Sequence, residues 1–244
     1  MTTTVIVILV IIAAKLFIDF YKNRWSSKSE TSSRMQAREM DQSIPDTPVG
    51  FGYKCLWFSI KSENVQRIAE ILKLGSLEPC NWEVGIDKAY KDAAFISPAI
   101  DGWTFAVGWQ LPVGDTLDGI KEVKECLRQL SREFGEAQYF CTHRITEYHF
   151  WAKAVKGKIT RAYGYIGESG ENIIVEGEPT DIEKKYKLVN TFSQEAQQEN
   201  YFDNVDVPDE EMVMEVAGSW SVDPSKLEDR KDLKEGMGWL STSA

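Results

Sequence analysis

One short, aromatic-rich stretch of this 244-residue chain contains most of the side chains that could do chemistry. It contains four residues of types that bind zinc: Cys141, His143, Glu147 and His149. Their odd numbers would place all four side chains on one face of an unbroken strand. A bend that we expect near Arg144 would separate the first two side chains from the last two. We therefore predict no metal site.

A second hypothesis uses only Glu147 and His149, two positions apart on the strand that follows the bend. Side chains with this spacing share a face, and a carboxylate beside an imidazole can act as an acid–base pair. Arg144 or Arg161 would then hold an anionic group of the substrate. The structural alternative is that Glu147 and His149 join the sheet to a helix, while Arg161 pairs with a carboxylate at the edge of the core. The remaining candidate binding residues are His143 and Trp151.

Sequence motifs for nucleotide binding and for the common hydrolases are absent from the chain. Gly164, Gly167 and Gly170 lie in a predicted hairpin, whereas a phosphate-binding loop joins a strand to a helix. The chain contains neither GxSxG nor HExxH, and it has only two histidines. We predict no cofactor.

The elements that must position these residues are strands with period-two alternation and amphipathic helices. The predicted strands are residues 53–60, 94–97, 103–111, 137–142, 146–155 and 158–166. One predicted helix is capped by Ser62, and a long helix that ends at Phe134 is capped by Asp115 or Thr116. The other predicted helices span residues 82–91, 210–217 and 225–234. The fold class that follows is α+β, with a mostly antiparallel sheet covered by helices on at least one face.

The last two predicted strands meet at a lysine–glycine turn. Uninterrupted pairing across this turn would set Phe150 opposite Tyr163 and would place Arg161 on the same aromatic face. His149 would lie on the other face. We interpret the aromatic face as core, and we expect the same of five tryptophans: Trp57, Trp82, Trp103, Trp109 and Trp151.

An apolar segment begins the chain. Residues 2–21 form a run of about 20 residues, which is long enough as a helix to cross a bilayer. Lys15 and Asp19 interrupt it, but they are four apart and can face each other on a helix. The alternative, a cleaved signal peptide, would carry its positive charge before the apolar run. We expect an uncleaved anchor in the lipid bilayer.

The sequence predicts four regions. Lys22, Arg24 and Lys28 follow the apolar run, so the rule that positive residues stay inside predicts a cytoplasmic domain. The predicted regions are an anchor (residues 1–24), a flexible linker (25–50), an α+β core domain (51–192) and an acidic helical segment packed on the core (193–244).

The chain is acidic, with a net charge of −10 and a pI near 4.9. That balance argues against nucleic acid as a partner, because binding phosphates needs a positive surface. Residues 194–235 contain 13 acidic residues and four basic ones. This segment forms either solvated helices packed on the core or a negative surface for a cationic protein partner.

The four cysteines are scattered and form no CxxC motif. In a reducing compartment they would be ordinary buried thiols. Two disulfides in an exported domain are the alternative.

Four blocks, DGWTFAVG, THRITEYHFWA, KITRAYGYIGE and VAGSWSVDP, resemble a set of uncharacterised bacterial proteins with no known function. The resemblance covers residues 53–224 and omits the anchor. It implies a bacterial source and brings no activity with it.

Two classes of function follow from these observations. The first is a membrane-anchored, non-enzymatic binding module, for example an immunity-type protein that neutralises a toxin. The second is a hydrolase or small-ligand sensor that uses Glu147 and His149 with Arg144 or Arg161.

Overall fold

The computed structural model describes residues 42–241. The predicted anchor and the predicted linker up to residue 41 lie outside the described residues. No helix within the described range is both long enough and apolar enough to cross a bilayer.

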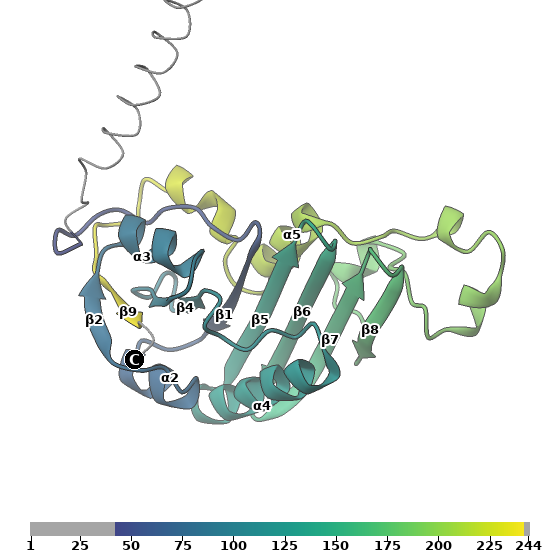
Figure 1. Cartoon of the computed structure of the whole chain (residues 1–244), viewed down its shortest axis with the longest axis horizontal. Helices are drawn as coiled ribbons and strands as arrows, with labels where there is room; N and C mark the ends of the chain where they lie inside the picture. Colours follow the sequence, from purple (N-terminus) through teal and green to yellow (C-terminus); the bar gives the residue numbers. More distant parts are fainter. Residues whose placement is uncertain (1–41, 242–244) are drawn as a thin grey trace, which may run out of the picture. The chain divides into compact units, whose positions relative to one another are not determined.

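A nine-stranded sheet forms the centre of the described chain, with the order β2-β9-β3-β4-β1-β5-β6-β7-β8 (Figure 1). Every pair of neighbouring strands is antiparallel. The strands are β1 (Cys55–Ile60), β2 (Leu77–Cys80), β3 (Ala94–Ile96), β4 (Thr104–Val107), β5 (Glu136–His143), β6 (Tyr148–Val155), β7 (Lys158–Ile166), β8 (Glu171–Glu176) and β9 (Gly238–Ser241). The predicted α+β class and antiparallel sheet are confirmed.

Helices cover both faces of the sheet. Helices α2 (Val65–Ile71) and α4 (Leu117–Phe134) pack on one face, where their apolar sides join the main core cluster. Helices α3 (Trp82–Ala89) and α5 (Glu210–Trp220) pack on the other face. Four short 3₁₀ helices complete the described chain: η1 (Glu183–Lys185), η2 (Gln194–Gln197), η3 (Phe202–Asn204) and η4 (Pro224–Asp229).

Both ends of α4 agree with the prediction, and each is set by a capping residue. Thr116 is the N-cap, and its hydroxyl accepts a hydrogen bond from the Gly119 N–H at 3.1 Å. Gly135 ends the helix at a φ of 89°, a conformation that glycine adopts at little cost. Both signals are local: the sequence predicts the end at Gly135 and offers Asp115 or Thr116 as the cap, and the structure shows that Thr116 is the cap.

The end of the predicted linker and the end of the chain both join the folded body. The Asp46 carboxylate accepts hydrogen bonds from the N–H groups of Trp82 (2.6 Å) and Glu83 (2.9 Å) at the start of α3. The Gly236 N–H donates to the Asp46 carbonyl at 2.9 Å. Strand β9, which the sequence did not predict, then inserts between β2 and β3. The helix predicted at residues 225–234 is instead the 3₁₀ helix η4.

A β-bulge in β7 overturns the predicted register. Near the turn, Ala154 pairs with Ile159, but the next pair is Lys153 with Arg161, so Thr160 is an extra residue. Beyond the bulge, every side chain of β7 lies on the opposite face from the one predicted, whereas the side chains of β6 lie on the predicted faces. The prediction that Phe150 pairs with Tyr163 is therefore wrong, and Arg161 lies on the face covered by α5.

The corrected register forms an aromatic row across four strands on the α5 face. Its members are Trp57, Phe140, Trp151 and Tyr163, which are direct cross-strand neighbours. The ring centroids of Trp57 and Phe140 lie 5.0 Å apart, and those of Trp151 and Tyr163 lie 4.6 Å apart. Of the five tryptophans predicted as core, all are buried except Trp109, which is partly buried. The four cysteines are buried free thiols.

Two leucines of α4 test the packing of this helix on the sheet. Leu127 is fully buried and Leu117 is 74% exposed. We expect Leu127→Ala to lower the free energy of unfolding by about 2–5 kcal/mol, because it removes buried methyl groups and leaves a cavity. The matched control Leu117→Ala should change it by less than about 0.5 kcal/mol. Equal effects in urea denaturation of the two variants would contradict this packing.

Candidate functional site

The four candidate zinc ligands do not converge. Cys141 is buried on the α4 face, and burial raises the pKa of its thiol. His143 packs its ring edge-on against Trp109, and its Nδ1 lies 3.2 Å from the Thr146 hydroxyl. His149, in contrast, pairs with Thr142 and so lies on the α5 face. Within the described chain, no group of three or more His, Cys, Asp and Glu residues could hold a metal ion.

Glu147 and His149 do not share a strand face. Residues 144–147 form a turn, and β6 begins only at Tyr148. Glu147 has a φ of 47°, which takes it out of strand geometry. Its side chain is exposed, whereas His149 is only 4% exposed. The spacing that suggested an acid–base pair is therefore interrupted by the turn.

A groove of about 650 Å³ opens between the β5–β6 turn and the N-terminus of α5. We call it the acidic groove. Its lining residues are Tyr53, Arg144, Glu147, His149, Val207, Pro208, Asp209, Glu210 and Glu211. The structure thus brings three of the predicted site residues, Arg144, Glu147 and His149, to one surface.

The carboxylates of the acidic groove differ in their partners. Glu210 accepts hydrogen bonds from Arg144 Nε (2.9 Å) and Nη2 (2.5 Å), so its charge is matched. Asp209 caps α5, and one of its oxygens accepts from the Met212 N–H at 2.8 Å. Glu147 and Glu211 are exposed and form no ion pair within residues 42–241. The groove therefore presents unmatched negative charge.

His149 forms part of the wall of the acidic groove. Its Nδ1 is buried and has no hydrogen-bond partner within the described chain. Burial lowers the pKa of the imidazole to about 4, although the nearby charges of Asp209 and Glu210 oppose that shift. His149 is therefore neutral at pH 7, and it adds no positive charge to the groove.

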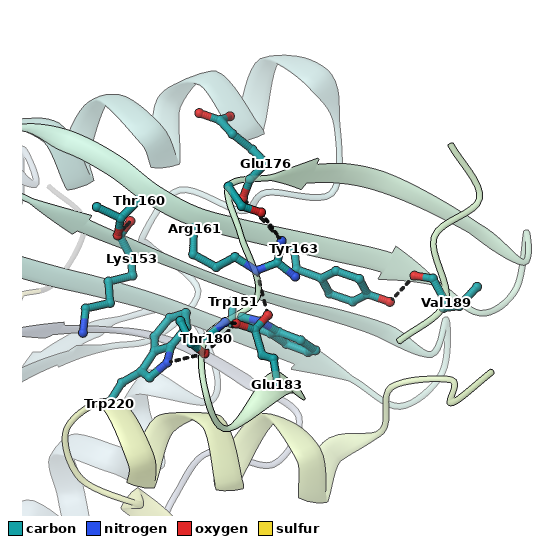
Figure 2. Close-up of polar contacts among 11 residues, drawn as sticks. Trp151, Lys153, Thr160, Arg161, Tyr163, Glu176, Thr180, Glu183, Val189 and Trp220 are labelled. Atoms are coloured by element: carbon teal, nitrogen blue, oxygen red, sulfur yellow. Dashed lines mark hydrogen bonds and ion pairs between the residues drawn. The ribbon is translucent and has the colours of Figure 1, made fainter. Parts of the chain in front are cut away.

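Arg161 lies elsewhere, in a buried polar cluster between the sheet and the strap, which is our name for residues 177–188 (Figure 2). Its Nε donates to Glu183 Oε1 at 2.7 Å, and both side chains are at least 97% buried. Its Nη1 donates to the carbonyl oxygens of Glu176 (3.4 Å) and Gly177 (2.9 Å). This is the carboxylate-paired arrangement that the sequence allowed as the structural alternative for Arg161.

Glu183 accepts more hydrogen bonds than the one from Arg161. Trp151 Nε1 donates to the same oxygen at 2.8 Å. Trp151, which the sequence proposed as a binding residue, therefore contacts Glu183 and does not line the groove. The N–H and the hydroxyl of Thr180 donate to the other oxygen at 2.8 Å and 2.6 Å. Trp220 of α5 in turn donates to the Thr180 hydroxyl at 3.1 Å, as Figure 2 shows. The cluster thus joins β6, β7, the strap and α5.

Sequence reasoning missed several residues of both sites. Asp209 could have been found, because an aspartate before two glutamates and an apolar run predicts a helix N-cap. Tyr53 and Glu183 gave no signal, since neither belongs to a pattern that predicts its distant partner.

Comparisons of the chain with protein-family models, with curated proteins and with solved structures gave no match.

Removal of the buried carboxylate tests the structural role of the cluster. We expect Glu183→Ala to lower the free energy of unfolding by about 3–5 kcal/mol, because it leaves the buried Arg161 guanidinium without its counter-charge. The control Asp181→Ala removes a carboxylate three residues from Lys184 in an exposed ion pair of the same strap. It should have no measurable effect in urea denaturation. A small effect of Glu183→Ala would contradict the role we assign to the pair.

Titration of His149 has a predictable effect on stability. The unfolded chain protonates this imidazole below about pH 6.5, whereas the folded chain does so only below about pH 4. Between these values the unfolded state binds more protons, so stability falls as the pH drops through this window. The full loss is at most about 3 kcal/mol.

The measurement is urea denaturation from pH 7.5 to pH 4, compared between the wild type and His149→Gln. The variant should lose this part of the pH dependence, while the titrating carboxylates contribute to both proteins. Identical pH profiles would contradict a buried, neutral His149.

Proposed function

We propose that this protein is a membrane-tethered, non-enzymatic binding module that holds a cationic protein partner in the acidic groove. The observation that supports this proposal is the unmatched charge of Glu147, Asp209 and Glu211 around the neutral His149, whose buried Nδ1 has no hydrogen-bond partner in the described chain. An immunity-type protein that neutralises a basic toxin would use such a surface. Glu147 and His149 both line the groove, but no hydrogen bond joins them among the described residues, which disfavours the hydrolase alternative.

The sign of the groove's potential follows from counting its charges. Four carboxylates line the groove and one cation, Arg144, offsets one of them. The N-terminus of α5 contributes about half a positive elementary charge through its dipole. The sum stays clearly negative. A lysine or arginine side chain of a partner would replace the missing counter-charge.

The negative charge of the chain is concentrated in the part that the structure describes. The first 41 residues contain six basic and four acidic residues, so residues 42–241 contain 22 basic and 34 acidic ones. A net charge of −12 on the described part attracts cationic proteins over a distance of about 10 Å at moderate salt. That field would speed encounter, while the acidic groove would fix the docking position.

The membrane tether is part of the same proposal. We propose that residues 2–21 cross the bilayer and that the trailing cations keep the folded domain in the cytoplasm. A C-terminal reporter that is active only outside the cytoplasm would overturn this orientation.

Neutralising the acidic groove should weaken binding to a cationic probe. We expect Glu147→Gln, Asp209→Asn and Glu211→Gln together to reduce the affinity of the full chain for decalysine by about tenfold or more, because three attractive charges are lost. Asparagine at position 209 can still cap α5, so the helix should remain folded. The measurement is fluorescence anisotropy of labelled decalysine at low salt, with the full chain in detergent.

A matched control separates the groove from bulk charge. Glu63→Gln, Asp92→Asn and Glu122→Gln remove the same three charges from other exposed positions. This control should bind decalysine nearly as tightly as the wild type. Equal losses in the two triple variants would show that only net charge matters, and that result would contradict the proposed site. In pull-downs from membranes, a stoichiometric partner should be lost from the groove variant and kept by the control.

A further inference from the structure

An acidic loop, residues 189–206, extends away from the sheet beyond β8 (Figure 1). Its two ends meet where Leu188 and Asp206 form a parallel bridge, and the Val189 N–H donates to the Asp206 carbonyl at 3.1 Å. The chain then continues directly into Val207, which lines the acidic groove. The end of the acidic loop is therefore adjacent to the acidic groove.

The base of the acidic loop is tightly held. Tyr201 is buried, and its hydroxyl accepts a hydrogen bond from the Asn190 N–H at 2.6 Å. Thr191 and Asn172 of β8 exchange two hydrogen bonds of 2.8 Å and 2.9 Å. At the other end of the loop, Asp206 accepts a hydrogen bond from the Lys187 N–H of the strap at 2.7 Å and donates its own N–H to the Lys187 carbonyl at 2.9 Å. The loop is therefore preorganised, which lowers the entropy cost of binding.

Two phenylalanines of this fixed loop face solvent. Phe192 is 63% exposed and Phe202 is 50% exposed, although Phe202 packs edge-on against Tyr201. Val207 follows at 44% exposure. Large exposed aromatic side chains on a preorganised loop are typical of contact sites for other molecules.

Every charged residue of the acidic loop itself is acidic. The acidic loop contains Glu195, Glu199, Asp203 and Asp206, and the sequence has no Lys or Arg from residue 188 to residue 225. An anionic bilayer surface or a second copy of this loop would be repelled by these carboxylates. A cationic protein surface with apolar side chains among its lysines or arginines complements both the charge and the exposed rings.

We propose that the acidic loop is a second contact site for the same cationic partner, with Phe192 and Phe202 as its apolar anchors. This inference rests on the proposed function and adds the partner's chemistry: it must present apolar side chains flanked by cations. The acidic groove supplies the electrostatic part of the interface, and the loop supplies the apolar part.

Two peptide probes of equal length and charge separate these parts. One contains leucine and lysine, and the other has serine at every leucine position. We expect the wild-type full chain to prefer the leucine–lysine peptide. The variant Phe192→Ala/Phe202→Ala should bind that peptide about tenfold more weakly, since truncated aromatic anchors commonly cost this much. Its affinity for the serine–lysine peptide should not change.

The control Ile44→Ala/Leu117→Ala truncates two other exposed apolar side chains and should leave both affinities unchanged. Equal affinity of the wild type for the two peptides, or an undiminished affinity of the loop variant, would overturn the inference. If the inference about the loop fails in this way but the triple groove variant binds both peptides more weakly than the wild type, the proposed function still stands. If the groove variant instead binds both peptides like the wild type, the proposed function itself fails.

A dye on the loop distinguishes a protein partner from the bilayer. Gln194 is exposed, so an environment-sensitive dye on Gln194→Cys would report contacts of the loop, while the four natural thiols are buried. In proteoliposomes of phosphatidylcholine and phosphatidylglycerol, we expect the emission to shift only when the leucine–lysine peptide is added. A shift on reconstitution alone would show that the loop inserts into lipid, which would overturn the inference.

Discussion

The buried ion pair between Arg161 and Glu183 is the interaction on which the strap, and with it the proposed binding surface, depends. Taking two charges out of water costs several kcal/mol for each ion, and their attraction offsets this cost only with good geometry and further hydrogen bonds. Here the pair has both, because Glu183 accepts from Arg161, Trp151 and Thr180 and the Arg161 guanidinium also reaches two backbone carbonyls. The pair exists only because the bulge at Thr160 turns Arg161 toward the α5 face.

Three consecutive segments of the sequence, beginning with the strap that contains Glu183, connect the buried pair to the proposed binding surface. The strap is fixed to the sheet at Glu183, the acidic loop starts where the strap ends, and α5 begins soon after the loop closes. Trp220 at the far end of α5 contacts the same cluster through Thr180. The acidic groove therefore lies between α5 and the β5–β6 turn. Its exposed carboxylates remain available to the proposed partner.

Local patterns in the sequence predicted the fold class, the helix between Thr116 and Gly135 and the burial of four of the five tryptophans, because caps and periodicity are local signals. Two errors arose where one residue changes a register. A bulge at Thr160 leaves alternation intact on both sides, so the sequence could not show that Arg161 changes face. The turn ending at Glu147 likewise breaks the two-residue spacing to His149. Strand β9 and the partner of Arg161 depend on long-range contacts that no local pattern encodes. The acidic segment was recognised as a candidate surface, but its shape as a groove and a loop was not.

The most direct measurement of the central claim is hydrogen–deuterium exchange of the full chain with and without decalysine. If the acidic groove is the docking site for cations, amide exchange should slow at residues 144–149 and 207–211 and stay unchanged at exposed acidic positions such as Glu63 and Glu122. Protection spread over the acidic surface in proportion to charge, or protection absent from those two segments, would contradict the account.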